Sequence, residues 1–196
     1  MSDAAPARIR PATVEDAAGI AAVQVATWRT AFRGIVADET LERMSVEERT
    51  ERWREVLSGD GRTCFVAESG LGESRRVAGF GDGGANRDPT PPYDAFTGEL
   101  RAIYVLQSHQ RGGTGTCLVR ALVQWLLEAG HGSMIVWTLE ASPFRAFYER
   151  LGGRRVGTRE VTIDGAPYAG VAYGWDDLTK LRRRLEEPGI VLDSSV

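Results

Sequence analysis

The sequence is poor in the residue types that build disulfide frameworks and metal sites. Its 196 residues include two cysteines, Cys64 and Cys117, and two histidines, His109 and His131, and neither pair has the spacing of a zinc site. A chain of this length buries roughly 70% of the surface that its unfolded form exposes, so it needs neither disulfides nor a metal to fold. We therefore expect a reduced protein without a structural metal.

Long apolar runs and a strong charge imbalance are also missing. No run reaches the ~20 apolar residues of a membrane span, and the first ten residues lack the apolar core of a signal peptide. With 24 Lys and Arg against 27 Asp and Glu, the net charge is −3, which disfavours a binder of nucleic acid. These absences predict a cytoplasmic protein that binds neither membranes nor nucleic acid.

Hydrophobic patterning and turn signals divide the chain into seven strands and five helices. Strands are expected at 8–10, 63–68, 76–82, 99–106, 133–139, 155–163 and 168–174. Helices are expected from 13 to about 28–32, and at 46–58, 114–129, 143–151 and 178–185. Thr13 and Ser45 carry capping signals, and Asp164-Gly165 has the composition of a hairpin turn. This order predicts an α/β fold with a mixed sheet of about seven strands flanked by about four helices, plus an additional C-terminal helix.

One stretch of the chain has the pattern of a ligand-binding turn. The strand predicted at 99–106 leads into a glycine-rich turn at 110–115 that opens a helix. Such a turn directs backbone N–H groups and the positive end of the helix dipole at one spot, where a pyrophosphate is the natural occupant. Thr116-Cys117 stands where a Walker A loop needs Lys before Ser or Thr, and the turn follows a mid-chain strand, unlike a Rossmann fingerprint. Both of those nucleotide sites are excluded.

Two motifs resemble a known family. Residues 110–115, Gln-Arg-Gly-Gly-Thr-Gly, are similar to the acyl-CoA-binding motif Gln/Arg-x-x-Gly-x-Gly/Ala of the GNAT superfamily of N-acetyltransferases. Residues 147–152, Phe-Tyr-Glu-Arg-Leu-Gly, resemble the Phe-Tyr-Glu-x-Leu-Gly element of the same family. Their order and separation make the resemblance specific, and it covers about residues 9–175.

The resemblance implies a single-domain GNAT-like fold at residues 1–175, followed by a C-terminal helix and a polar tail at residues 176–196. The last helix carries Leu178, Leu181 and Leu185 on one side. This apolar side could pack on its own sheet or on a second copy of the chain, so a homodimer stays open.

The resemblance also implies a function. An N-acetyltransferase would move an acetyl group directly from acetyl-CoA, its co-substrate, to a primary amine of a small molecule or peptide, without a metal. Two alternatives stay open: a non-catalytic acyl-CoA-binding sensor or partner module, and an acyltransferase whose acyl donor is bound to a tRNA or carrier protein. Ser142 keeps the first alternative open, because family members often carry Asn at this position, where it contacts the cofactor arm.

Site residues follow from the same resemblance. Tyr148 matches the acid that protonates the departing thiolate, and its ordinary pKa near ~10 keeps it protonated at neutral pH. Glu99 matches the position where some members place a carboxylate that deprotonates the amine through water, with bulk water as the alternative base. The Val105 N–H is the expected donor to the thioester carbonyl. Cofactor contacts are expected at Ile103, Val105, Gln110, Arg111, Gly112, Gly113, Thr114, Gly115, Thr116 and Ser142.

The acceptor pocket is expected between the first two helices and the last hairpin. Its wall would include Trp28, Phe32, Arg33 and Tyr168. Arg33 suits an acceptor with a carboxylate or a phosphate, whereas the acidic overall charge suits a cationic amine. These two indications conflict, and the sequence selects no acceptor.

Overall fold

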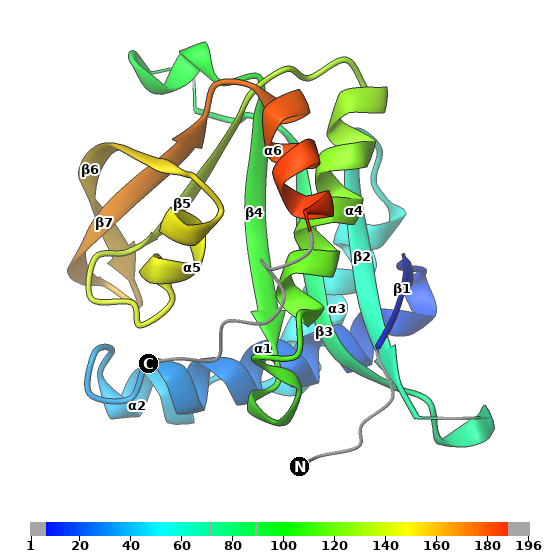
Figure 1. Ribbon diagram of the computed structural model, residues 1–196. Coiled ribbons are helices and arrows are strands. Elements are labelled where there is room, and N and C mark those ends of the chain that lie inside the picture. The colour runs from blue at the N-terminus through cyan, green and yellow to red at the C-terminus, as the bar shows by residue number, and fades with distance from the viewer. Residues whose placement is uncertain (1–6, 71, 89, 188–196) are drawn as a thin grey trace.

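The computed structural model describes residues 7–70, 72–88 and 90–187, and Figure 1 shows one sheet with helices on both faces. The strands run in the order β1-β2-β3-β4-β5-β7-β6. Their bounds are β1 Arg8–Pro11, β2 Arg62–Ser69, β3 Arg76–Ala85, β4 Gly98–Val105, β5 Met134–Leu139, β6 Arg154–Ile163 and β7 Ala166–Trp175. Within these residues the β4–β5 pair is parallel and the other five neighbouring pairs are antiparallel. The predicted α/β fold with a mixed seven-stranded sheet is confirmed.

Helices cover both faces of this sheet. They are α1 Ala17–Ala31, α2 Asp38–Glu42, α3 Val46–Ser58, α4 Thr114–Glu128, α5 Arg145–Arg150 and α6 Leu178–Glu186. Successive side chains of a strand point to opposite faces. On β3, Phe80 packs against Trp53 of α3 with ring centroids 5.0 Å apart, whereas a Cβ at Gly81 would lie 3.6 Å from Leu118 of α4. Thus α4 and α6 lie on one face and α1 and α3 on the other (Figure 1). None of the helices in the described ranges is long and apolar enough to cross a membrane.

Local hydrogen bonds explain two of the predicted boundaries. Ser45 caps α3, because its Oγ accepts a hydrogen bond from the Glu48 N–H at 3.2 Å. Asp164 and Gly165 connect β6 to β7 with φ values of 51° and 81°, both in the left-handed region. Two successive residues of this kind form the hairpin turn whose twist matches that of the flanking strands.

Some boundaries differ from the prediction, and one helix was not expected. The helix expected from residue 13 begins with a 3-10 turn at Val14–Asp16, and α1 follows from Ala17. The strand expected to end at residue 82 continues to Ala85, because its pairing with β4 persists through the two glycines that follow. The pattern does not predict α2, because five residues are too few to display a helical period.

The last helix packs against its own chain. Leu178, Leu181 and Leu185 of α6 are each 3% exposed or less and share a cluster with Leu122 and Leu126 of α4. The apolar face of α6 is therefore covered by the domain itself (Figure 1). The polar tail expected after this helix lies outside the described residues from residue 188 onward.

Candidate active site

The sheet opens between its two parallel strands. β4 and β5 pair over three residues each, from Gly98 to Leu100 and from Met134 to Val136. β4 nevertheless continues to Val105 and β5 to Leu139. Over this further length β4 stays paired with β3 on its other edge. The edge of β4 that faces β5 therefore carries backbone groups without a strand partner.

The direction of these backbone groups follows from one hydrogen bond. The Leu106 N–H donates to the Ala78 carbonyl at 2.9 Å and so points toward β3. Because N–H groups alternate sides along an antiparallel strand, those of Val105 and Ile103 point into the opening. The Val105 carbonyl points the same way and accepts a hydrogen bond from Gln110 Nε2 at 2.8 Å. Ile103 and Val105 are thus placed to bond an extended ligand as an added strand would.

The glycine-rich turn closes one end of the opening. Arg111 and Gly113 both adopt left-handed backbone conformations, with φ of 61° and 81°, and Gly113 is the N-cap of α4. Left-handed residues within a turn make successive N–H groups converge on a concavity that suits an anion. The first intrahelical hydrogen bond is donated by the Cys117 N–H to the Gly113 carbonyl, so the N–H groups from Gly113 to Thr116 have no partner inside the helix. The helix dipole adds positive potential there. This end of the opening therefore suits a pyrophosphate.

A cavity of about 770 Å³ runs through the opening. Its wall contains most of the residues that the sequence indicated: Trp28, Phe32, Ile103, Val105, Gln110, Arg111, Gly113, Gly115, Thr116, Ser142 and Tyr148. Gly112 and Thr114 belong to the same turn without forming part of the wall. The turn, the free edge of β4 and α5 therefore meet at one cavity.

Tyr148 brings a buried hydroxyl to this cavity. It lies on α5, is 6% exposed, and its ring packs against Phe147, Tyr173 and Trp175 at centroid distances of 5.5, 5.8 and 6.5 Å. Its Oη makes no hydrogen bond within the described part of the chain. Burial raises the pKa of Tyr148, so the hydroxyl stays protonated across the neutral range. The side chain is thus an available proton donor.

Ser142 stands between β5 and α5 and is 4% exposed. Its Oγ accepts a hydrogen bond from the Phe144 N–H at 3.2 Å, which stabilises the turn before α5. The hydroxyl proton remains available for a ligand in the cavity. A cofactor contact at this position is compatible with the geometry.

Glu99 lies on β4 but is not part of the cavity wall. It is 8% exposed, and its two carboxylate oxygens accept hydrogen bonds from Nε and Nη2 of Arg87, both at 2.8 Å. This ion pair raises the pKa of the Arg87 guanidinium. The geometry therefore holds Glu99 in a two-point ion pair beside the site.

The structure also leaves Arg33 and Tyr168 outside the cavity wall. Arg33 is exposed after the end of α1. Tyr168 lies on β7, where its Oη accepts a hydrogen bond from the Ala37 N–H at 3.4 Å. Of the four residues expected around the acceptor, Trp28 and Phe32 line the cavity, and their rings pack 4.9 Å apart.

Several wall residues carry no motif in the sequence. Arg101, Tyr104 and Trp137 line the cavity from β4 and β5. A signal exists for Arg101, because a charged residue inside a strongly apolar predicted strand needs a polar environment in the fold. No such signal distinguishes Trp137 from an aromatic residue of the core.

Sequence comparisons agree with this geometry. A family model described as FR47-like protein matches residues 93–162, from the segment before β4 to β6. YuaI of Bacillus subtilis (strain 168), which is named an uncharacterized N-acetyltransferase, is 34% identical over 177 residues. The match covers 90% of this chain and 97% of YuaI.

Solved structures share the fold. A GCN5-related N-acetyltransferase from Rhodopseudomonas palustris matches with a TM-score of 0.66 and 20% identity, covering 89% of this chain and 98% of that one. YncA of Salmonella typhimurium, solved with its cofactor acetyl-CoA, matches with a TM-score of 0.62 and 18% identity, covering 89% and 95% of the two chains. On its identity with YuaI and on this shared fold, the chain belongs to the GNAT superfamily of N-acetyltransferases.

Proposed function

We propose that this acetyltransferase moves an acetyl group from acetyl-CoA directly to a primary amine of a small molecule or peptide. One observation carries the proposal: the anion-binding turn, the unpaired edge of β4 and the protonated Tyr148 line a single cavity. Amide formation from a thioester needs an anchored donor, a polarised carbonyl, a free amine and a proton for the departing thiolate. The cavity wall provides a group for each of these tasks except the deprotonation of the amine.

The residues present fit acetyl-CoA as the donor. The N–H groups at 111–116 would hold its pyrophosphate at the start of α4. Backbone groups of Ile103 and Val105 would bond the pantetheine arm, and the Ser142 hydroxyl would add one hydrogen bond. The Val105 N–H would polarise the thioester carbonyl, and Tyr148 would donate its proton to the thiolate. A bound acetyl-CoA supplies the activated acetyl group.

Direct transfer is supported by the absence of a thiol from the cavity wall. Neither Cys64 nor Cys117 belongs to that wall in the described residues, and burial raises the pKa of the Cys64 thiol. Mixing the protein with acetyl-CoA and a panel of amines should release free thiol and add one acetyl group to an amine. Intersecting initial-rate plots are expected for direct transfer, whereas parallel plots would indicate an acyl-enzyme.

The amine proton can leave through Glu99 and water or through bulk water alone. Both oxygens of Glu99 already accept hydrogen bonds from Arg87, and Glu99 is not part of the cavity wall, which favours the second route. We expect Glu99→Gln to lower kcat less than Tyr148→Phe does, by under about tenfold, because it removes no group from the cavity wall. Steady-state rates of both variants at saturating acetyl-CoA test this order, and a loss of about 100-fold or more in the Glu99 variant would assign the base to Glu99.

Acetyl-CoA is expected to stabilise the folded protein. At 100 times its dissociation constant a ligand adds about 2.7 kcal/mol, which raises the melting temperature of a chain of this size by about 5–10 °C. NAD and ATP at the same concentrations serve as controls and are expected to give no such shift. An absent shift with acetyl-CoA would contradict the assigned donor.

Gly113→Ala is expected to weaken acetyl-CoA binding by at least about tenfold, because a Cβ disfavours the left-handed conformation that directs the turn's N–H groups. Gly130→Ala is a matched control at the other end of the same helix, with φ of 87° and open space around the added Cβ. Both variants should lose similar stability in thermal melts. Titration with acetyl-CoA should find reduced affinity in the Gly113 variant alone, and equal affinities would remove the turn from the cofactor site.

A further inference from the structure

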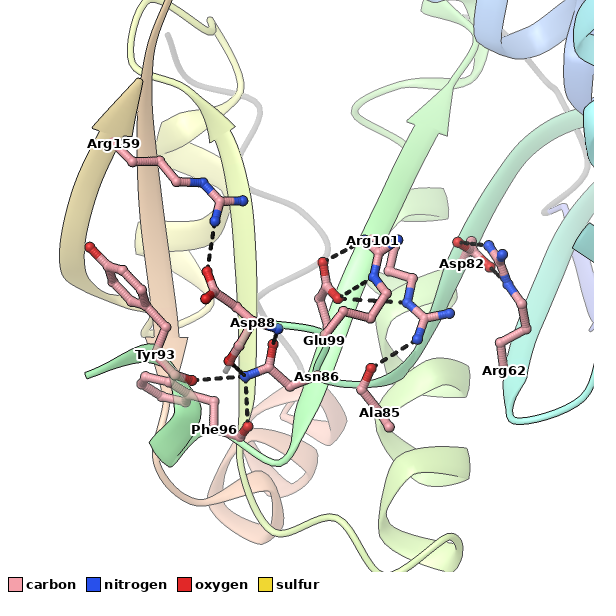
Figure 2. A network of polar contacts seen from close by, with 11 residues as sticks. Arg62, Asp82, Ala85, Asn86, Asp88, Tyr93, Phe96, Glu99, Arg101 and Arg159 are labelled. Atoms are coloured by element: carbon pink, nitrogen blue, oxygen red, sulfur yellow. Dashed lines mark hydrogen bonds and ion pairs between the residues drawn. The ribbon is translucent and has the colours of Figure 1, made fainter. Parts of the chain in front are cut away.

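A network of charged side chains extends from the sheet beside the cavity to the segment before β4 (Figure 2). Three of its arginines each have a carboxylate of their own within hydrogen-bond distance. The pairs are Arg62 with Asp82 at 2.5 Å, Arg87 with Glu99 at 2.8 Å, and Arg159 with Asp88 at 2.6 Å. The charges of these pairs cancel. Arg101 is the fourth arginine of the network, and its ion pair among the described residues is a long one, with a Glu99 oxygen that Arg87 already binds.

Arg101 is a buried cation whose hydrogen bonds are incomplete. Its side chain is 10% exposed, and Nη2 donates to the Ala85 carbonyl at 2.8 Å. The buried Nε has no acceptor among the described residues. Glu99 Oε2 is 3.7 Å from it, too far for a hydrogen bond, and already accepts one from Arg87. Burial, followed by repulsion from the Arg87 and Arg62 guanidinium groups, lowers the pKa of Arg101. Attraction from Asp82 and Glu99 acts in the opposite direction. The four arginines of the network thus face three carboxylates, which leaves one positive charge in excess.

This charge belongs to the acceptor end of the cavity. Arg101 lines the wall together with apolar side chains from the end of α1, from β5 and from β6, namely Phe32 (the C-cap of α1), Trp137, Leu139, Val161 and Ile163. The wall contains no Asp or Glu within the residues that the structure describes. An amine that carried only positive charge would meet repulsion here and find no partner. A buried guanidinium whose Nε–H has no hydrogen-bond acceptor is costly, and an anionic group on the acceptor would relieve that cost.

We propose that the acceptor is a primary amine that also bears a carboxylate, and that Arg101 binds this carboxylate. The inference rests on the acetyl transfer proposed above. Arg101 precedes Val105 by four residues, about 13 Å along an extended strand. The carboxylate therefore lies at one end of the bound acceptor and the reacting amine at the other, beside Val105 and Tyr148. Arg33, the cation that the sequence indicated for this task, is exposed outside the cavity.

The wild-type protein alone can test this inference. The probes are pairs of amines that differ only in the carboxylate, namely the ω-amino acids of two to ten carbons with the corresponding alkylamines, so that the spacing between amine and carboxylate varies along the series. Loss of a hydrogen bond to a charged group costs about 10- to 100-fold in kcat/KM. In at least one pair we therefore expect kcat/KM to be about 10- to 100-fold higher for the amine that bears the carboxylate. Equal or better acetylation of the plain amines throughout would overturn the inference.

Substitutions of Arg101 and Arg33 test which residue causes the preference for the carboxylate-bearing amine. Arg101→Gln should remove the preference within the best pair, so that the kcat/KM ratio falls toward one, whereas Arg101→Lys should keep part of it, because the charge remains and the two-point geometry does not. The matched control, Arg33→Gln, removes an exposed guanidinium and should leave the ratio unchanged. A preference that survives in Arg101→Gln would show that another group binds the carboxylate, and the assignment to Arg101 would be wrong.

Failure of this inference and failure of the proposed function give different results. A protein that acetylates plain amines but no carboxylate-bearing member keeps the proposed function and loses the acceptor class. A protein that acetylates no amine and is not stabilised by acetyl-CoA loses both. Stabilisation by acetyl-CoA without acetylation of any carboxylate-bearing amine also overturns the acceptor class, because the series covers every spacing that the inference allows.

Discussion

Tyr148→Phe is expected to lower kcat by about 10²- to 10⁴-fold, the range in which a positioned general acid contributes. The substitution removes one oxygen and keeps the ring that packs between Phe147 and Tyr173. Because the Oη makes no hydrogen bond in the described structure, the fold loses little when it is removed. Stopped-time assays of thiol release should therefore find a slow enzyme whose affinity for acetyl-CoA and melting temperature match the wild type.

Tyr173→Phe is the matched control for this experiment. The Tyr173 ring also packs against Tyr148, but its hydroxyl donates to Glu149 Oε1 at 2.7 Å and does not line the cavity. Its removal should cost about 1 kcal/mol of stability and change kcat by less than about twofold. If Tyr148→Phe lost cofactor affinity and kcat equally, the hydroxyl would be a binding group and the acid role would be contradicted.

The pH dependence of the wild type follows from the same hydroxyl. Burial raises the pKa of Tyr148 above its ordinary value, and the protonated form is the active one. The Tyr148 hydroxyl therefore keeps its proton as the pH rises, and kcat should not decline between about pH 7 and about pH 10. A decline centred near neutral pH would assign the acid to another group.

Apart from α2, the order of strands and α-helices could be predicted from the sequence because each element depends on a local period. The motif at residues 110–115 could also be recognised from the sequence, because a predicted strand precedes it and a predicted helix follows it. An anion-binding turn requires that arrangement. The resemblance placed Tyr148 at the cavity for the same reason, through a motif on a single helix.

The environment of Arg101 could not be predicted because it depends on pairings between distant segments. Whether a strand arginine has a carboxylate depends on the register of β3 against β4 and on the segment that carries Arg87 and Asp88. The same limitation applies to Glu99, whose position matches a family base while its ion pair comes from a residue twelve positions earlier. Spacing within one element contains no information about either contact.

The pair between Arg62 and Asp82 shows how much such a contact contributes to the fold. Asp82 lies in the middle of the sheet with its side chain 2% exposed, and Arg62 Nε and Nη2 donate to its two oxygens at 3.1 and 2.5 Å. Burial raises the pKa of Asp82, and the guanidinium of Arg62 offsets part of that shift. Without Arg62 the carboxylate would be a buried charge that lacks its hydrogen-bonding partner.

Arg62→Gln is therefore expected to lower the free energy of unfolding by about 3–5 kcal/mol at neutral pH, or the melting temperature by about 6–20 °C. The matched control is Arg154→Gln, which breaks a pair of similar geometry, with two hydrogen bonds of 2.8 Å to Asp176, at 58% and 64% exposure. That variant should lose less than about 1 kcal/mol, because water solvates both charges. Thermal and urea unfolding of the two variants give the comparison, and equal losses would mean that burial does not set the cost.

The pH dependence separates an unpaired charge from lost packing. A carboxyl whose pKa is raised in the folded state favours folding most at low pH and loses that contribution as the pH rises through the folded value. Removing Arg62 raises the pKa of Asp82 further, so protonation neutralises the orphaned carboxylate at an accessible pH. The deficit of Arg62→Gln relative to the wild type should therefore shrink from about pH 7 to about pH 4. A deficit that stays constant over this range would trace the loss to the packing of the arginine stem instead of to the charge of Asp82.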